Sequence, residues 1–253
     1  MKQVITEIED SLGLVIINRP KSLNALTQDM ISDITESVES LSRIEDVSTI
    51  GIVGRGKAFS AGCDVVSLYN CGESEIGEFM DVGRSCVQSI EMCPKPVVAG
   101  VEGWCLGGAF EILLACDFVF ATQDAVFGFP EVKLGIIPGF GGTQLTVHRM
   151  GQARAKELIM TGRRIDLLTA FEWGLVNRNV ADGELLDSIK DFAEMLERRH
   201  PKALAAAKRA INDGKNGFTA AMKTEREGFM TCFEDPFTRE NLCQFSEHVE
   251  KAK

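Results

Sequence analysis

The feature that most constrains the fold of this chain is a change in residue pattern near Thr143. Before that point, short β-branched and apolar runs alternate with segments whose apolar residues recur at helical spacing; after it, the pattern is nearly all helical. Strands that alternate with crossover helices are typical of an α/β core. We therefore predict an α/β core over residues 1–199 and a helical region over residues 200–253. The helical region either packs back on the core or makes subunit contacts.

The expected elements are short strands and amphipathic helices. The predicted strands cover residues 4–7, 12–17, 49–53, 97–101, 118–121 and 126–127. Thr27 is a suitable N-cap for the first long helix, whose apolar positions are Met30, Ile31, Ile34, Val38 and Leu41. Further helices are predicted at residues 76–92, 109–115, 152–160, 167–173, 183–199, 201–213 and 218–230. A glycine-rich turn is expected at 103–108 and mostly loop at 128–142.

Charge and cysteine usage exclude several classes of protein. The formal net charge of −10 disfavours nonspecific nucleic-acid binding, which requires a basic surface, but it leaves room for an anionic ligand held by backbone N–H groups. The eight cysteines form no CxxC pair and no cluster with zinc-ligand spacing, as expected for free thiols. The N-terminal residues resemble no secretory signal, and no apolar run is long enough to span a membrane. We expect a cytoplasmic protein without a metal.

Two glycine-containing turns have the composition of sites that expose backbone N–H groups. The first is Phe59–Asp64, which lies between a predicted strand and a helix start. The second is Gly103–Glu111, in which a glycine pair opens a helix whose dipole favours negative charge. Each could be a tight structural turn when considered alone. If the two turns face one point, they form an oxyanion hole.

Two glutamates follow these turns in the sequence. Glu111 lies in the first turn of the predicted helix, where a carboxylate also interacts favourably with the helix dipole. Glu131 lies in a loop among Phe127, Phe129, Val132 and Leu134. Apolar neighbours desolvate a carboxyl and raise its pKa, which makes it a usable acid or base near neutral pH. A plain surface-loop glutamate is the alternative at position 131.

Taken together, four motifs resemble those of the enoyl-CoA hydratase/isomerase (crotonase) family. They follow in order over about residues 12–180 and comprise Asn18–Leu26, Ala58–Asp64, Gly103–Asp117 and Phe127–Gln144. The resemblance implies a spiral of ββα units with a C-terminal helical region for oligomerisation, assembled as a homotrimer or a dimer of trimers. It also implies an acyl-CoA thioester substrate with no separate cofactor, since coenzyme A is part of the substrate.

The resemblance also implies roles for individual residues. The backbone N–H groups of Cys63 and Gly108 correspond to the oxyanion hole that binds the thioester oxygen. Glu111 and Glu131 correspond to the two catalytic glutamates of hydratases, so both being present favours hydration of a 2-enoyl-CoA over isomerisation. The residues expected to bind the coenzyme A and acyl portions are Lys21, Leu23, Ala25, Lys57, Ala61, Asp64, Val65, Trp104, Phe129 and Gly139.

Three positions depart from the family pattern and bear on substrate choice. Phe129 replaces a more usual glutamine beside the acid, Ala109–Phe110 replaces a glycine and a small residue, and Leu145 replaces an arginine. None removes a catalytic group. Isomerisation or another crotonase-family reaction therefore remains an alternative within enzymes. Outside enzymes, the alternatives are an oligomeric scaffold, which the two retained acids disfavour, and an RNA-binding protein, which the net charge disfavours.

Overall fold

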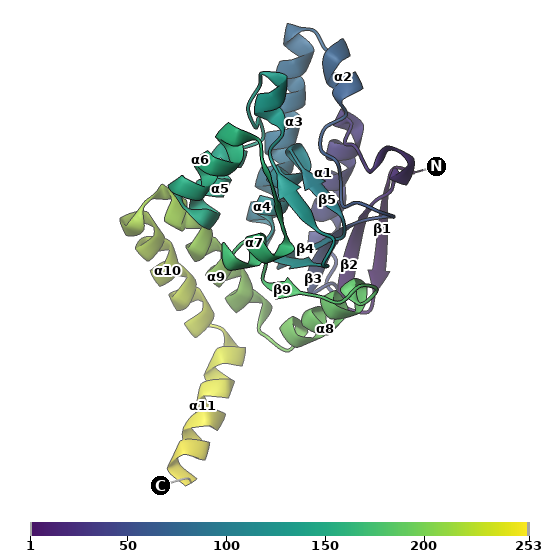
Figure 1. The fold of residues 1–253 in the computed structure, drawn as a ribbon. Coiled ribbons are helices and arrows are strands. Elements are labelled where there is room, and N and C mark those ends of the chain that lie inside the picture. The colour runs from purple at the N-terminus through teal and green to yellow at the C-terminus, as the bar shows by residue number, and fades with distance from the viewer. Residues whose placement is uncertain (1, 252–253) are drawn as a thin grey trace. The chain divides into compact units, whose positions relative to one another are not determined.

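The computed structural model describes residues 2–251, with side chains described up to residue 244. The chain forms two compact units, residues 1–198 and residues 199–253. The first unit contains every strand among the described residues, and the second is helical. Figure 1 shows the ribbon, with most of the helices and strands labelled.

Six strands of the first unit form one sheet in the order β1-β2-β3-β4-β6-β9. β1 and β2 pair antiparallel as a hairpin, and every later neighbour in the sheet is parallel. Parallel pairing requires a crossover between successive strands, and the helices supply it. The strands are β1 (Val4–Glu9), β2 (Leu12–Ile17), β3 (Thr49–Gly54), β4 (Val97–Val101), β6 (Phe118–Ala121) and β9 (Arg178–Asn179).

A second, three-stranded sheet lies within the same unit in the order β5-β7-β8. β5 (Trp104–Leu106) pairs parallel with β7 (Val126–Gly128), which pairs antiparallel with β8 (Arg164–Asp166). The prediction that residues 103–108 are only a turn was therefore wrong. The structure after Thr143 is nearly all helical, as predicted, but two short strands that were not predicted, β8 and β9, also lie there. Strands of two or three residues give little alternation, and of the short strands β5, β7, β8 and β9 only β7 was predicted.

The helices of the first unit largely match the predicted ones. Thr27 accepts a hydrogen bond from the N–H of Met30 at 3.3 Å, which confirms the predicted N-cap. All five predicted apolar positions of α1 are buried. The helices are α1 (Gln28–Ser42), α2 (Val65–Asn70), α3 (Glu73–Met92), α4 (Gly108–Ala115), α5 (Gly142–Met150), α6 (Gln152–Thr161), α7 (Leu167–Glu172) and α8 (Leu185–Glu197), with short 3-10 turns at Pro20–Ser22 and Glu131–Leu134.

Helices cover both faces of the larger sheet, and glycines in the strands make room for them. A Cβ added at Gly13 would lie 2.8 Å from a methyl carbon of Leu41 on α1. On the opposite face, a Cβ at Gly100 would lie 2.7 Å from the terminal carbon of Ile189 on α8, and Gly51 also faces Ile189. Gly13 of β2 pairs with Ile50 of β3, so Gly51 lies one residue further along and faces the other side of the sheet. Gly13 therefore faces α1, and Gly51 faces α8.

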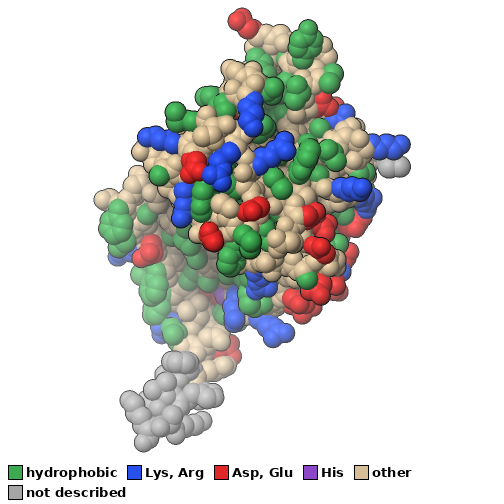
Figure 2. All heavy atoms as spheres, viewed as in Figure 1, with side chains coloured by type: hydrophobic (Ala, Val, Ile, Leu, Met, Phe, Trp, Pro, Cys, Tyr) green, Lys and Arg blue, Asp and Glu red, His purple; other side chains and the backbone are tan. Residues whose placement is uncertain are grey.

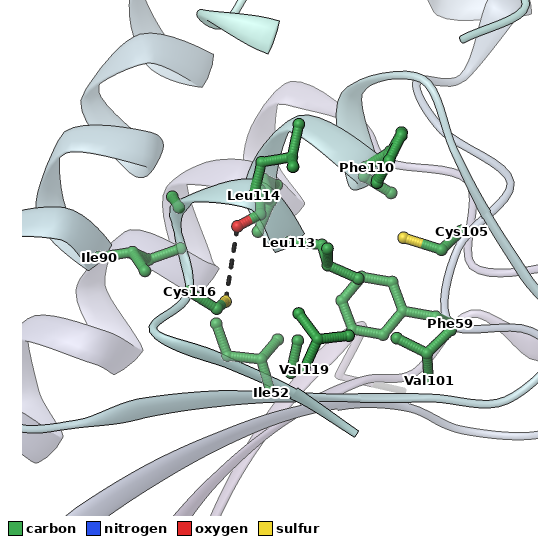
Figure 3. Close-up of a cluster of buried hydrophobic side chains, with 14 of the residues drawn as sticks. Ile52, Phe59, Ile90, Val101, Cys105, Phe110, Leu113, Leu114, Cys116 and Val119 are labelled. Carbon is green, nitrogen blue, oxygen red and sulfur yellow. Dashed lines mark hydrogen bonds between the residues drawn. The ribbon is translucent and has the colours of Figure 1, made fainter. Parts of the chain in front are cut away.

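The short helix α4 lies at the centre of the first unit. All eight of its residues are buried, so it is enclosed on every side. Figure 3 shows side chains of α4, including Leu113, with Ile52, Val119 and Phe59 around them in one apolar cluster. Close packing of this kind leaves a helix little freedom to shift. A charged group carried by α4 is therefore held in a fixed position.

The second unit consists of α9 (Pro201–Asn212), a 3-10 turn (Asp213–Asn216), α10 (Phe218–Phe233) and α11 (Pro236–Lys251), which confirms the predicted helical region. α9 and α10 pack closely where Gly228 faces the Cβ of Ala206. No side chain of either helix is buried in the single chain. Several large apolar side chains of this unit are exposed, among them Ile211, Phe218 and Phe229.

No helix of residues 2–251 combines the length and the apolar character needed to cross a bilayer. None of the eight cysteines forms a disulfide in the part of the chain that the structure describes. Within those same residues, no group of three or more histidine, cysteine, aspartate or glutamate side chains is arranged to hold a metal ion.

Candidate active site

A cavity of about 860 Å³ opens beside the N-terminus of α4. Four stretches of chain line it: the end of the first glycine turn with the start of α2, one side of α3, the start of α4, and the segment from Pro130 to Gln144. Its walls are mainly apolar and include Leu68, Ile76, Phe79, Met80, Leu134, Ile136 and Ile137. Its titratable side chains are Cys63, Arg84, Glu111 and Glu131. A mainly apolar cavity with a few converging polar groups is the usual form of a ligand site.

The first glycine turn is attached to β5. The N–H of Ser60 donates to the carbonyl of Trp104 at 2.8 Å, and the N–H of Leu106 donates to the carbonyl of Ser60 at 3.1 Å. Gly62 has a φ of +101°, and a Cβ there would lie 2.8 Å from the Leu106 carbonyl oxygen. Only glycine fits so close an approach in the left-handed region. These contacts bring Cys63 beside the start of α4.

The second glycine turn joins β5 to α4. Gly107 has a φ of +54°, and its N–H donates to the carbonyl of Gly128 at 3.0 Å. The next residue, Gly108, begins α4, and a Cβ there would lie 2.5 Å from the sulfur of Cys63. The two turns that the sequence singled out are thus neighbours in space. No backbone carbonyl within residues 2–251 accepts the N–H of Cys63 or of Gly108.

Glu111 projects from the first turn of α4 and is almost fully buried, with 2% of its surface exposed. The loop before α5 and the first residue of α5 supply three hydrogen bonds to its carboxylate. Oε1 accepts from the N–H groups of Phe140 at 2.8 Å and Gly142 at 2.6 Å, and Oε2 accepts from the N–H of Gly139 at 3.2 Å. Burial raises the pKa of Glu111, and these N–H groups oppose that rise.

Glu131 occupies the start of the 3-10 turn Glu131–Leu134 and is 9% exposed. Its Oε2 is buried and has no hydrogen-bond partner among the described residues. Burial raises its pKa from 4.5 to about 7; its own N–H lowers the pKa and the charge of Glu111 raises it further. The sequence predicted a desolvated carboxyl with a raised pKa at this position, and the structure confirms that environment.

The predicted binding residues differ in whether they line the cavity. Ala61, Val65 and Gly139 line the cavity together with the two turns and the two glutamates. Asp64 does not line it, because its carboxylate pairs with Arg19 at 2.5 Å and caps the start of α2. The pKa of Asp64 is lowered, first by the hydrogen bond from Arg19. Lys21, Leu23 and Ala25 do not line the cavity either. Their segment lies next to it, because the N–H of Ala61 donates to the carbonyl of Leu23 at 2.9 Å.

Three of the predicted binding residues lie elsewhere. Lys57 and Trp104 border a separate cleft that also contains Glu102, Asp124 and Asp182. The Trp104 ring faces outward, and the Arg164 guanidinium lies 4.9 Å from its centre. Phe129 is fully buried and packs on Phe110, with 4.7 Å between ring centres. Alternation along β5 explains the position of Trp104, whose side chain points away from the face that Cys105 presents to the core.

Sequence reasoning missed the residues that hold Glu111. Residues 128–142 were expected to be mostly loop, with no contact to Glu111 predicted, whereas a Cβ at Gly142 would lie 2.8 Å from Glu111 Oε1. α3 also contributes to the cavity through Phe79, Met80 and Arg84. Only the apolar spacing of this helix was visible in the sequence, and that spacing does not tell which structure the helix packs against.

Comparison with known proteins decides the family. The sequence profile described as enoyl-CoA hydratase/isomerase matches residues 7–253. This chain belongs to the enoyl-CoA hydratase/isomerase family. A relative named crotonyl-CoA hydratase, from Syntrophomonas wolfei, is 38% identical and covers 97% of this chain and 95% of its own length. A short-chain-enoyl-CoA hydratase from Clostridium acetobutylicum is 36% identical, and the match covers 100% of this chain and 97% of that protein.

Solved structures of family members have the same fold. An enoyl-CoA hydratase subunit from Geobacillus kaustophilus superimposes with a TM-score of 0.92 at 33% identity, over 98% of this chain and 96% of that one. An enoyl-CoA hydratase from Thermoplasma volcanium gives a TM-score of 0.88 at 32% identity, over 96% of each chain. The predicted crotonase-like α/β fold is therefore confirmed.

Proposed function

We propose that this chain catalyses the reversible addition of water to a 2-enoyl-CoA thioester, giving a 3-hydroxyacyl-CoA. The observation that carries the proposal is the pair of buried glutamates on one cavity, each in a different environment. Glu111 has its carboxylate held by three N–H groups, and Glu131 has an oxygen with no partner and a pKa of about 7. Carboxyls whose environments differ can divide acid and base roles. The two named hydratases in the family support this choice of reaction.

The backbone N–H groups of Cys63 and Gly108 bind the thioester oxygen in this proposal. Protonation of C2 and attack at C3 pass through an enolate whose charge lies on that oxygen. Neither N–H group donates to a backbone carbonyl in the described chain, which supports this assignment. Removal of one such donor typically costs about 3–4 kcal/mol of transition-state stabilisation.

The proton steps balance with one proton shared by the two glutamates. Ionised Glu111 takes a proton from water as the water oxygen bonds to C3. The C2–C3 π electrons move toward the thioester, and C2 then receives a proton from Glu131. The proton on Glu111 afterwards returns to Glu131, which restores the starting state. No further cofactor is required, because coenzyme A enters and leaves as part of the substrate.

The apolar walls of the cavity supply the acyl site. Leu68, Ile76 and Phe79 line one side and Leu134 and Ile137 another. Burial of apolar surface favours binding by about 25 cal/mol per Å². Ala61, Val65 and Gly139 lie next to the glutamates, and we assign Lys21, Leu23 and Ala25 to the coenzyme A portion on the strength of the family motif. The separate position of Trp104 and Phe129 argues against direct acyl contacts by these two rings.

We also propose that the helical unit 199–253 carries contacts between copies of this chain, in a homotrimer or a dimer of trimers. Its exposed Ile211, Phe218 and Phe229 support this, since exposed apolar clusters commonly mark interfaces. Basic and acidic side chains intermingle on the face in Figure 2, which disfavours the nucleic-acid alternative. Light scattering of the purified protein tests the assembly: a mass of three or six chains supports it, and a monomer contradicts it.

The reaction is tested with crotonyl-CoA. We expect loss of the conjugated enoyl absorbance and formation of 3-hydroxybutyryl-CoA, identified by mass spectrometry. A 3-enoyl-CoA is offered in a parallel reaction. Conversion of the 3-enoyl-CoA without hydration of crotonyl-CoA would replace our proposal with an isomerase. Binding of thioesters with neither reaction would favour a catalytically silent scaffold.

A further inference from the structure

The ring of Phe140 occupies a space between two helices that only glycines leave open. On α3, a Cβ added at Gly83 would lie 2.1 Å from a ring carbon of Phe140. On α4, a Cβ added at Gly108 would lie 2.8 Å from another ring carbon. The ring is 3% exposed and also packs on Phe79, with 5.5 Å between ring centres. Its position is therefore fixed from both helices.

The backbone of the same residue holds a glutamate of the proposed reaction. The N–H of Phe140 donates to Glu111 Oε1 at 2.8 Å, between the donors Gly139 and Gly142. Gly108, against which the ring packs, supplies one of the two N–H groups proposed to bind the thioester oxygen. A displacement of this one ring would therefore disturb both the Glu111 carboxylate and the N–H of Gly108.

α3 holds this loop at a second point. The Nε of Arg84 donates to the carbonyl of Gly139 at 3.2 Å, and Met80 lies 3.5 Å from where a Gly139 Cβ would be. Neighbouring positions on one helix thus contact both the side chain of residue 140 and the carbonyl of residue 139. Such contacts orient the N–H groups of residues 139–142 toward Glu111.

We propose that Phe140, seated between Gly83 and Gly108, is a positioning residue that aligns the Glu111 carboxylate and the oxyanion-binding turn with each other. The inference rests on the proposed hydratase function for its kinetic readout. It predicts that hydration depends on a residue of α3 that itself contacts no reacting atom. Misplacement of reacting groups by about 1 Å can reduce a rate about 100-fold.

Gly83→Ala tests the proposal, and Gly77→Ala is the matched control. Both glycines lie on α3, but a Cβ at Gly77 would meet nothing within 4 Å. For Gly83→Ala we expect kcat on crotonyl-CoA to fall about 10- to 100-fold with KM changed far less. Gly77→Ala should match the wild type. The double variant Gly83→Ala/Phe140→Ala, which removes the ring atoms that the added methyl group would meet, should recover part of the lost kcat.

Two outcomes would overturn the inference: wild-type kcat in a folded Gly83→Ala protein, or a double variant no faster than Gly83→Ala. Thermal unfolding of each variant separates loss of folding from loss of alignment. Phe140→Leu alone provides a second, milder perturbation, and its kcat should fall between those of the wild type and Gly83→Ala.

A titration keeps the inference testable if the wild type proves not to be a hydratase. Infrared spectra of the carboxyl bands, assigned with Glu111→Gln, report the pKa of Glu111 without turnover. Loosening of its three N–H donors should raise that pKa further in Gly83→Ala, while Cys63, Arg84 and Glu131, the other titratable groups facing the cavity, are unchanged. An unchanged Glu111 titration would contradict the positioning role, whereas an inactive wild type with the shifted titration would contradict only the proposed reaction.

Discussion

The two glutamates of the cavity differ in the hydrogen bonds that their surroundings offer to the carboxylate. Three N–H donors bind the carboxylate of Glu111, two from the loop before α5 and one from the first residue of α5. The 3-10 turn at Glu131 leaves one buried oxygen without a partner. A carboxylate that accepts several hydrogen bonds is held in place. A buried carboxylate without partners is destabilised by desolvation, so its pKa rises and it can exchange a proton near neutral pH. The difference suggests a fixed group that orients water and a second group that transfers the proton at C2.

The largest expected effect is on turnover. Glu111→Gln and Glu131→Gln should each lower kcat for crotonyl-CoA hydration about 10²- to 10⁴-fold, because general acid–base terms act in the transition state. Affinity for the thioester should change little, since neither carboxylate is assigned to coenzyme A. Steady-state kinetics and calorimetric binding of a saturated acyl-CoA measure the two quantities. A variant that retains near wild-type kcat would remove that glutamate from the mechanism.

A smaller loss is expected when only the surroundings of Glu111 are changed. A Cβ at residue 142 would lie 2.8 Å from Glu111 Oε1, so Gly142→Ala must displace the carboxylate or the loop. We expect kcat to fall about 10- to 100-fold. Gly214→Ala, where nothing lies within 4 Å of the added Cβ, serves as a control for a general glycine effect. Equal kcat in Gly142→Ala and the control would mean that the position of Glu111 is not critical.

The two glutamates should also differ in their effect on stability. The pKa of Glu131 is raised from 4.5 to about 7, so the folded state binds more protons than the unfolded state between these values. Stability therefore falls as pH rises through this window, by about 3 kcal/mol at most. Neutral Glu131→Gln should be more stable than wild type at pH 8, by about 1–3 kcal/mol, and lose this advantage near pH 4.5.

Glu111→Gln should not share the gain of Glu131→Gln at pH 8. The amide NH2 of a glutamine would face one of the N–H donors that now bind the carboxylate, which leaves a buried donor unsatisfied. Denaturant unfolding at pH 8 and pH 5 compares the variants. Equal stability of the two glutamine variants at both pH values would contradict the difference in environment.

The smallest expected effect is the pH dependence of the wild type. Hydration requires one proton on the pair of glutamates, so kcat/KM should decline above pH about 7 as Glu131 ionises, and at low pH as Glu111 is protonated. Addition of water neither releases nor takes up a proton. The hydration and dehydration directions must therefore show the same profile of kcat/KM, and a flat profile from pH 6 to 9 would place the proton donor elsewhere.

Most of the fold could be predicted because its signals are local. Thr27 and the apolar positions of α1 are adjacent features of one segment, and their prediction was confirmed. β5, β8 and β9 were missed because two or three residues carry little alternation, and of the strands this short only β7 was predicted. Their pairing is set by segments distant in sequence, as where Gly128 meets Arg164.

The site could be predicted in part for the same reason. Glu131 has apolar neighbours in its own loop, so its desolvation was visible in the sequence. The N–H donors to Glu111 lie about thirty residues later in the sequence, and no residue near Glu111 in the sequence indicates them. Likewise, nothing in α3 indicated that Gly83 faces the ring of Phe140. The local sequence pattern identified the two glutamates, whereas the N–H donors to Glu111 and the contact between Gly83 and Phe140 could be identified only from the tertiary structure.

Exchange of hydrogen at C2 tests the division of roles most directly. Butyryl-CoA has no double bond to hydrate, so its C2 exchange in D2O requires only a base at C2 and the oxyanion-binding turns. Mass spectrometry of the recovered thioester should show deuterium at C2 with the wild type and with Glu111→Gln, and none above background with Glu131→Gln. Exchange that persists in Glu131→Gln but is lost in Glu111→Gln would contradict our assignment of the two glutamates.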